Sequence, residues 1–376
     1  KFSFGSLNDH ANRTAKVLSD LGIKKNDRVA LYLRNRPPLV RCLFSLWKLG
    51  AIPVTISSLY GKEEFLKAVK TSNAVMIIAD ERTLTTATSS DIAIPCYAIE
   101  DGEVLSGKVK NIDDMANKLA SGSVSLKPPS GGDAVILFTG GTTGEPKAVS
   151  MTHDGTLETM SRLAKSSKGG KKGPYPLVDE ETPPNLVPLP LFHSGGQQAL
   201  LFAFHVGRSV LMIEKFSGQL VGNLVAEYRL DNLFLLPTML FDLVQLSEEP
   251  DLSSVRSILV AGGEVSSALR TRFEARYQIP LLTNYGSTEV GHVAGWTSVD
   301  IRSGQWIPGS AGRIYDGVEA EIRNEEGISL KTEETGEIFV RTSVSSSYIA
   351  GGDNTPTADD GWVATGDIGY ITSDKI

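Results

Sequence analysis

The chain has 376 residues, of which 41% are hydrophobic and 22% charged, which is the ordinary composition of a globular protein with a large core. Its net charge of −7 argues against a protein that binds nucleic acid or anionic membranes, since such proteins usually present a basic face. Two cysteines, Cys42 and Cys96, form no metal or redox motif. No apolar run approaches membrane-spanning length, so the expected location is the cytoplasm.

Helix and strand patterns alternate through the first 290 residues. Apolar residues at helical spacing predict helices at 7–21, 37–49, 63–71, 218–228, 238–246 and 266–277. Short continuous apolar runs predict buried strands at 28–33, 51–56, 74–79, 133–138, 208–213, 232–236, 255–260 and 280–284. Such alternation predicts mainly parallel sheets covered by helices on both faces.

These strands are too many for one ordinary sheet, so we expect an α/β fold with two packed αβ layers. The first subdomain is expected at roughly 1–150 and the second at roughly 151–290, with an interleaved arrangement of the two as the alternative. Beyond residue 293 the spacing of apolar residues changes to period-two alternation, as in 318–323 and 337–341, and helical patterns are not found. Residues 291–376 are therefore expected to form a small antiparallel, β-barrel-like unit.

The most informative segment is Phe138-Thr-Gly-Gly-Thr-Thr-Gly-Glu-Pro-Lys147. A buried strand that opens into glycines, threonines and a lysine can direct N–H groups, hydroxyls and a positive charge at phosphate oxygens. The Walker A pattern does not fit, because Gly140 is followed after four residues by Glu145, and Lys147 by Ala148. No Gly-x-Gly-x-x-Gly sequence opens a helix either.

This loop resembles the phosphate loop of the adenylate-forming superfamily, which comprises acyl- and aryl-CoA synthetases, peptide-synthetase adenylation domains and luciferases. Two further motifs support the resemblance in the right order: Asn284-Tyr-Gly-Ser-Thr-Glu289 resembles the family's Tyr-Gly-x-Thr-Glu, and Thr365-Gly-Asp367 its Thr-Gly-Asp. The resemblance covers the whole chain and is strongest to an acyl- or aryl-CoA ligase. Gly140 departs from the family pattern, in which serine is commoner.

The residues supply groups for a triphosphate and its metal. The expected phosphate cradle is Thr139, Gly140, Gly141, Thr142, Thr143, Gly144 and Lys147. Thr288 and Glu289 share one short turn, which could offer a hydroxyl to the α-phosphate and a carboxylate to Mg²⁺. In the resembling family the glutamate at this place has that metal role.

The nucleoside needs a slot for adenine and an anchor for ribose. The expected residues for both are Gly262, Gly263, Glu264, Asn284, Tyr285, Gly286 and Asp367. Tyr285 offers a π face, and the turn of small residues lets the backbone approach the base. A carboxylate such as Asp367 can accept hydrogen bonds from two vicinal hydroxyls. Glu264 replaces a commoner small residue of the family.

The expected acid pocket is lined by His193, Gln197, Gln198, Val260, Gly291 and His292. The resemblance gives His193 a place in the catalytic site, where it lines or gates the pocket. Amino-acid-activating members carry an aspartate after the phenylalanine of this stretch, but here Phe192 is followed by His193. We therefore expect an acyl or aryl acid and not an α-amino acid.

The expected activity is ATP-dependent formation of an acyl- or aryl-adenylate with Mg²⁺, followed by transfer to coenzyme A. Three alternatives remain: a nucleotide-binding module without catalysis, an adenylating enzyme with another acceptor, and a phosphate-releasing NTPase. Family members continue into a mobile domain with a catalytic lysine. The chain stops at Ile376, so we expect this domain to be a missing partner. The sequence gives no indication of oligomeric state.

Overall fold

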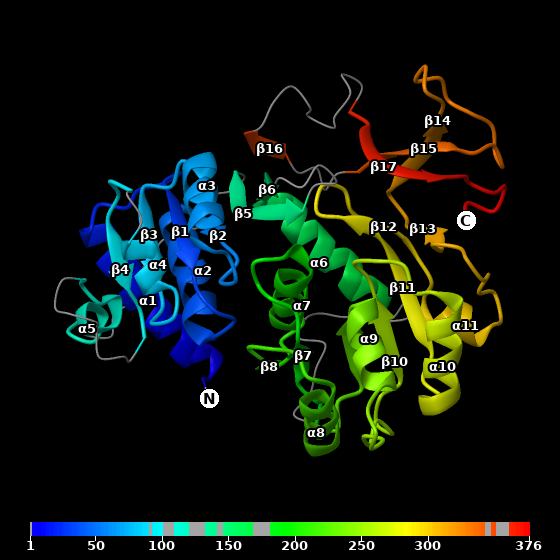
Figure 1. Cartoon of the computed structure of the whole chain (residues 1–376), viewed down its shortest axis with the longest axis horizontal. Coiled ribbons are helices and arrows are strands. Elements are labelled where there is room, and N and C mark those ends of the chain that lie inside the picture. The colour runs from blue at the N-terminus through cyan, green and yellow to red at the C-terminus, as the bar shows by residue number, and fades with distance from the viewer. Residues whose placement is uncertain are drawn as a thin grey trace. The chain divides into compact units, whose positions relative to one another are not determined.

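A computed structural model describes residues 2–89, 92–100, 109–119, 132–140, 146–167, 181–342, 347–350 and 361–376 (Figure 1). The chain forms two compact units whose segments alternate along the sequence. Unit 1 consists of Lys1–Thr156, Pro190–Ser194 and Ser346–Asp353, and unit 2 of Leu157–Leu189, Gly195–Ser345 and Asn354–Ile376. The subdomain limits expected from the sequence stay a prediction.

Unit 1 contains a seven-stranded sheet with the order β16-β6-β5-β2-β1-β3-β4. Its strands are β1 (Arg28–Tyr32), β2 (Ile52–Thr55), β3 (Met76–Ala79), β4 (Cys96–Ala98), β5 (Asp133–Gly140), β6 (Pro146–Thr152) and β16 (Ser347–Ala350). The first five strands are mutually parallel, whereas β6 runs antiparallel to β5, and β16 antiparallel to β6. The sheet is therefore parallel up to the strand that precedes the Gly/Thr loop.

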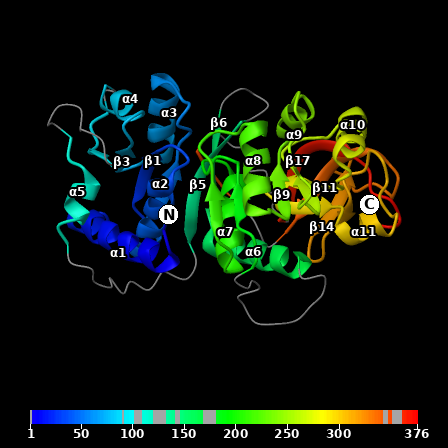
Figure 2. The same cartoon turned by 90° about the horizontal axis from the view of Figure 1, so that it is seen from below.

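Helices cover both faces of this sheet. They are α1 (Phe4–Asp20), α2 (Pro37–Leu49), α3 (Lys62–Ser72), α4 (Leu84–Thr88) and α5 (Ile112–Ala116). Figure 2 shows α1 on one side of β1 and β3, and α3 and α4 on the other. The sequence sets the ends of α2 clearly, because Pro37 occupies its first turn and Gly50 follows it with φ 67°.

Unit 2 contains a five-stranded sheet, a three-stranded antiparallel sheet and a short pair. The first has the order β13-β12-β11-β10-β9, the second β14-β15-β17, and the pair is β7-β8. The strands are β7 (Asn185–Val187), β8 (Val210–Met212), β9 (Asn232–Leu235), β10 (Ser257–Val260), β11 (Leu281–Ser287), β12 (Gly291–Gly295), β13 (Arg313–Ile314), β14 (Glu319–Arg323), β15 (Gly336–Arg341) and β17 (Val363–Gly369). The helices are α7 (Ser194–His205), α8 (Gly218–Tyr228), α9 (Pro237–Val244), α10 (Ser267–Tyr277) and α11 (Ser298–Arg302). Helix α6 (His153–Ser167) begins in unit 1 and continues in unit 2 from Leu157.

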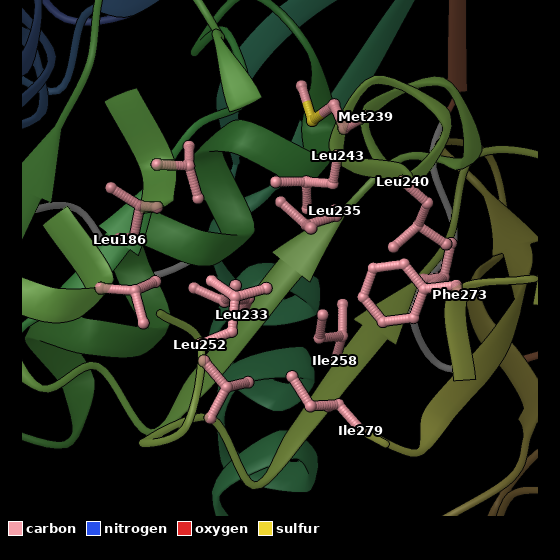
Figure 3. Packing of buried hydrophobic residues seen from close by; sticks show 14 of the residues in the cluster. Leu186, Leu233, Leu235, Met239, Leu240, Leu243, Leu252, Ile258, Phe273 and Ile279 are labelled. Atoms are coloured by element: carbon pink, nitrogen blue, oxygen red, sulfur yellow. The ribbon is translucent and has the colours of Figure 1, made fainter. Parts of the chain in front are cut away.

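Strands β9, β10 and β11 are parallel, and their apolar side chains form the main core of unit 2. Figure 3 shows Leu233, Leu235 and Ile258 from the strands packed against Leu240 of α9 and Phe273 of α10. These side chains are at most 3% exposed. The packed core therefore holds β10 and β11 firmly, and their carboxyl ends carry candidate site residues.

The mixed α/β class, the mainly parallel sheets and the small antiparallel sheet are all confirmed. One expectation was wrong: the region beyond residue 293 contains a helix, α11. It escapes a periodicity search because it has only five residues, and it is defined by a capping box between Thr297 and Asp300. Among the described residues, no helix combines the length and the apolarity needed to cross a membrane.

Candidate functional site

The part of the Gly/Thr loop that the structure describes forms the end of the β5–β6 hairpin in unit 1. Thr139 lies opposite Lys147, and Gly140 lies opposite Pro146. Strand β5 is parallel to β2 at Ile136, so the hairpin end projects from the carboxyl edge of a parallel sheet. The four expected cradle residues Gly141, Thr142, Thr143 and Gly144 lie outside the described residues. The structure thus brings Thr139, Gly140 and Lys147 together.

His193 also belongs to unit 1, in the short segment 190–194. Its backbone N–H donates to the carbonyl of Pro190 over 3.1 Å, and the N–H of Leu191 donates to Asn35 Oδ1, also over 3.1 Å. Asn35 is buried and follows β1, so a residue remote in sequence fixes this segment. Burial lowers the pKa of His193 below its usual value, which favours a neutral imidazole.

In unit 2, the Tyr-Gly-Ser-Thr-Glu motif builds the β11–β12 hairpin. Ser287 pairs with Gly291, so Thr288, Glu289 and Val290 form a three-residue loop. Val290 is only 2% exposed and packs in a small core, while Thr288 and Glu289 are partly exposed. The buried valine anchors the loop and leaves the hydroxyl and carboxylate beside it accessible.

The glycine of this motif is required by packing. A Cβ on Gly286 would lie 1.9 Å from the carbonyl oxygen of Gly291 on the facing strand, which is far inside any real contact. The register between β11 and β12 shifts at this point. Gly286 therefore lets the two strands approach closely where the hairpin begins to turn.

The Thr-Gly-Asp motif forms a bulge in β17. Glu337 of β15 pairs with Ile368 and Phe339 pairs with Ala364, so three residues of β17 oppose one residue of β15. The bulge brings Asp367 to Tyr285 of β11, whose hydroxyl donates to Asp367 Oδ2 over 2.8 Å. Two motif residues 82 positions apart are thereby joined.

The adenine candidates lie at the carboxyl ends of β10 and β11. Val260 pairs with Thr283, so the turn that follows β10 starts beside Asn284. This turn contains the exposed residues Gly262, Gly263 and Glu264, and Gly262 has φ 79°. Asn284 accepts a hydrogen bond from the hydroxyl of Tyr315 over 3.1 Å at Oδ1. Tyr315 has no sequence signal that relates it to the site.

Among the candidate acid-pocket residues, His292 and Gln198 are in direct contact. His292 Nε2 lies 2.9 Å from Gln198 Oε1, so Nε2 carries the hydrogen that is donated. Burial lowers the pKa of His292 to about 4, which keeps the imidazole neutral at pH 7. Gln197 and Val260 are 3% and 1% exposed, so both are almost fully enclosed.

Magnesium stays the expected metal, with Glu289 as its expected protein ligand. Within the described ranges, no three or more His, Cys, Asp or Glu side chains are placed to hold a metal ion. Mg²⁺ is commonly bound through one or two carboxylates together with phosphate oxygens and water. Glu289, the expected ligand, lies in an accessible turn and is therefore compatible with that kind of site.

Comparisons with known proteins agree on one family. Residues 1–349 match the model of the family described as AMP-binding enzyme. A crotonobetaine/carnitine–CoA ligase of Citrobacter koseri is 31% identical over 399 residues, covering 98% of this chain and 72% of that protein. The corresponding enzyme of Escherichia coli O157:H7 is 30% identical over 395 residues, with the same coverage.

Solved structures share the fold. The inhibitor-bound N-terminal domain of FACL13 from Mycobacterium tuberculosis has a TM-score of 0.81 at 25% identity, covering 100% of this chain and 91% of that one. The anthranilate CoA ligase AuaEII in complex with anthranoyl-AMP has a TM-score of 0.87 at 22% identity, covering 99% and 71%. By the family match and the sequence identity to ligases, the chain belongs to the AMP-binding enzyme family and is an enzyme of its ligase type.

Proposed function

We propose that this enzyme uses ATP to activate a carboxylic acid as an acyl- or aryl-adenylate, releases pyrophosphate, and then forms a thioester with coenzyme A. The observation that carries the proposal is the hydrogen bond between Tyr285 and Asp367. It joins an aromatic side chain to a carboxylate, although the two belong to different motifs and different sheets. That pairing suits a nucleoside with an adenine ring and a ribose.

In the reaction, a carboxylate oxygen of the acid attacks the α-phosphorus of ATP and the bond to pyrophosphate breaks. Both reactants are anionic, so positive charge and N–H dipoles must offset their repulsion. We assign this task to Lys147, the glycines and threonines of its loop, and Thr288. Mg²⁺ held through Glu289 would supply further positive charge at the phosphates.

The acid is best sought among compact acyl and aryl acids. His292 is held neutral, and its described partner is the uncharged Gln198. His193 is also favoured as neutral by burial. None of the candidate acid-pocket residues is a carboxylate that could pair with the ammonium group of an α-amino acid. The named relatives are CoA ligases, which supports coenzyme A as the acceptor.

The test is acid-dependent exchange of radioactive pyrophosphate into ATP, measured with a panel of aryl, short-chain and long-chain acids. Because this chain covers 72% of the ligases that it matches, exchange is measured on the full-length protein, and nucleotide binding on this chain. We expect exchange with some acids, AMP as the nucleotide product, and AMP release that increases with coenzyme A. ADP and orthophosphate as products, or no exchange with any acid, would refute the proposal.

Glu289→Gln tests the metal assignment with the shape of the side chain kept. We expect it to abolish exchange while AMP binding remains, because AMP lacks the β- and γ-phosphates of ATP and so depends less on a metal. Glu326→Gln is the matched control, since Glu326 is an exposed carboxylate between β14 and β15. Equal exchange rates for the two variants would refute the assignment of Glu289 as a metal ligand.

A further inference from the structure

The bulge in β17 holds the backbone of Asp367 in a defined place. Gly366 has φ 77°, and its N–H donates to Glu337 Oε1 over 3.2 Å. Thr365 Oγ1 donates to the carbonyl of Ile338 over 2.9 Å and accepts from the N–H of Asp367 over 3.2 Å. These bonds fix the backbone of the bulge from both sides.

They do not fix the carboxylate itself, because rotation of an aspartate about its last torsion is broad and nearly two-fold. Asp367 is exposed, so packing does not restrict this rotation. The one hydrogen bond that the structure records for its carboxylate comes from the hydroxyl of Tyr285 over 2.8 Å. Tyr285 is itself held, since it lies in β11 and packs against the small core that includes Val290.

A carboxylate oxygen has two lone pairs, so the hydroxyl of Tyr285 occupies one acceptor position on Oδ2. Oδ1 and the second lone pair of Oδ2 stay available for two donors, which is what a vicinal diol supplies. Burial raises the pKa of Tyr285 above its usual value, so the hydroxyl remains a donor at neutral pH. The arrangement is therefore preset before a nucleotide arrives.

We propose that Tyr285 is a positioning residue for Asp367: its hydroxyl orients the carboxylate for the ribose diol, separately from any stacking of its ring on adenine. The inference rests on the nucleotide-binding part of the proposed function. It attributes part of the selectivity for a ribonucleotide to the hydroxyl of Tyr285, which would not contact the sugar. Pre-orientation of this kind raises affinity because less ordering is needed on binding.

The test is calorimetric binding of AMP, 2′-deoxyAMP and 3′-deoxyAMP to wild-type protein, Tyr285→Phe, Asp367→Ala and the double variant. Tyr285→Phe keeps the ring and removes only the hydroxyl. We expect AMP to bind this variant about tenfold more weakly, the scale of one hydrogen bond to a charged group. The affinities for the two deoxynucleotides should fall less, so the ratio of AMP affinity to deoxynucleotide affinity should decrease. The double variant should bind AMP no more weakly than Asp367→Ala alone.

Tyr277→Phe is the matched control, because its hydroxyl donates to the carbonyl of Leu243 over 2.7 Å within the core of the same unit. We expect it to leave the preference for AMP unchanged. Equal weakening of AMP and both deoxynucleotides by Tyr285→Phe, or additive losses in the double variant, would overturn the inference. Absence of AMP binding by the wild-type protein would overturn it together with the nucleotide part of the proposed function. Ribose-selective binding without pyrophosphate exchange would support the inference and refute only the proposed activation.

Discussion

Replacing His292 with glutamine should reduce the loss of folding stability between pH 7 and pH 5. Burial lowers the pKa of His292 from 6.5 to about 4. In the unfolded chain the imidazole gains a proton near pH 6.5, whereas in the fold it stays neutral until about pH 4. The neutral form therefore contributes stability above pH 6.5, and this contribution is lost as the pH falls toward 4. Between pH 7 and pH 5 the two pKa values correspond to a loss of about 2 kcal/mol.

His292 as a residue is only partly buried, so about 2 kcal/mol is an upper figure for its contribution. The assay is urea unfolding of wild-type protein and His292→Gln at pH 7 and pH 5. The wild-type free energy of unfolding should fall by up to about 2 kcal/mol more than that of the variant. Other histidines with a lowered pKa, such as His153 and His193, are present in both proteins, so their contributions cancel in the comparison. Equal losses in the two proteins would refute the reasoning.

Three further substitutions test the local structure. Asn35→Leu removes the acceptor for the N–H of Leu191 and should cost about 1–3 kcal/mol in urea unfolding. Gly286→Ala forces a Cβ against the carbonyl of Gly291 and should cost more than about 3 kcal/mol, or prevent folding; a smaller cost would contradict the packing reason. Gly366→Ala meets no atom within 4 Å and should cost only about 1–2 kcal/mol for its left-handed backbone, while AMP affinity falls because the bulge moves.

The order of the main helices and strands could be predicted because each depends on local patterns. β1 and β3 are continuous buried apolar runs, and α2 has both a proline start and a glycine stop. The loop that includes Thr139 could be located because a buried strand precedes it. These local patterns do not indicate which strands pair with each other. Nothing local indicates that β16 joins β6 in unit 1, nearly 200 residues away in the chain.

The contact between Tyr285 and Asp367 was beyond sequence reasoning for the same reason. The motifs that contain them can be recognised separately, but the contact depends on two extra residues in β17 opposite Ile338. A bulge leaves no trace in the hydrophobic pattern. Tyr315 could not be predicted at all, because it lies outside all three motifs and yet its hydroxyl donates to Asn284.

The predicted set of site residues contains no positive charge within unit 2. Its members from unit 2 are neutral or acidic: Gln197, Gln198, Val260, Gly262, Gly263, Glu264, Asn284, Tyr285, Gly286, Thr288, Glu289, Gly291, His292 and Asp367. Carboxylates and an aromatic ring suit sugar hydroxyls and a base, but carboxylates repel phosphate unless a metal lies between them. In the proposed function, Mg²⁺ would therefore supply the positive charge at the residues of unit 2, and Lys147 is the charged candidate of unit 1. Loss of Mg²⁺ should consequently weaken the binding of ATP far more than that of AMP, because only ATP places three phosphates against this acidic set.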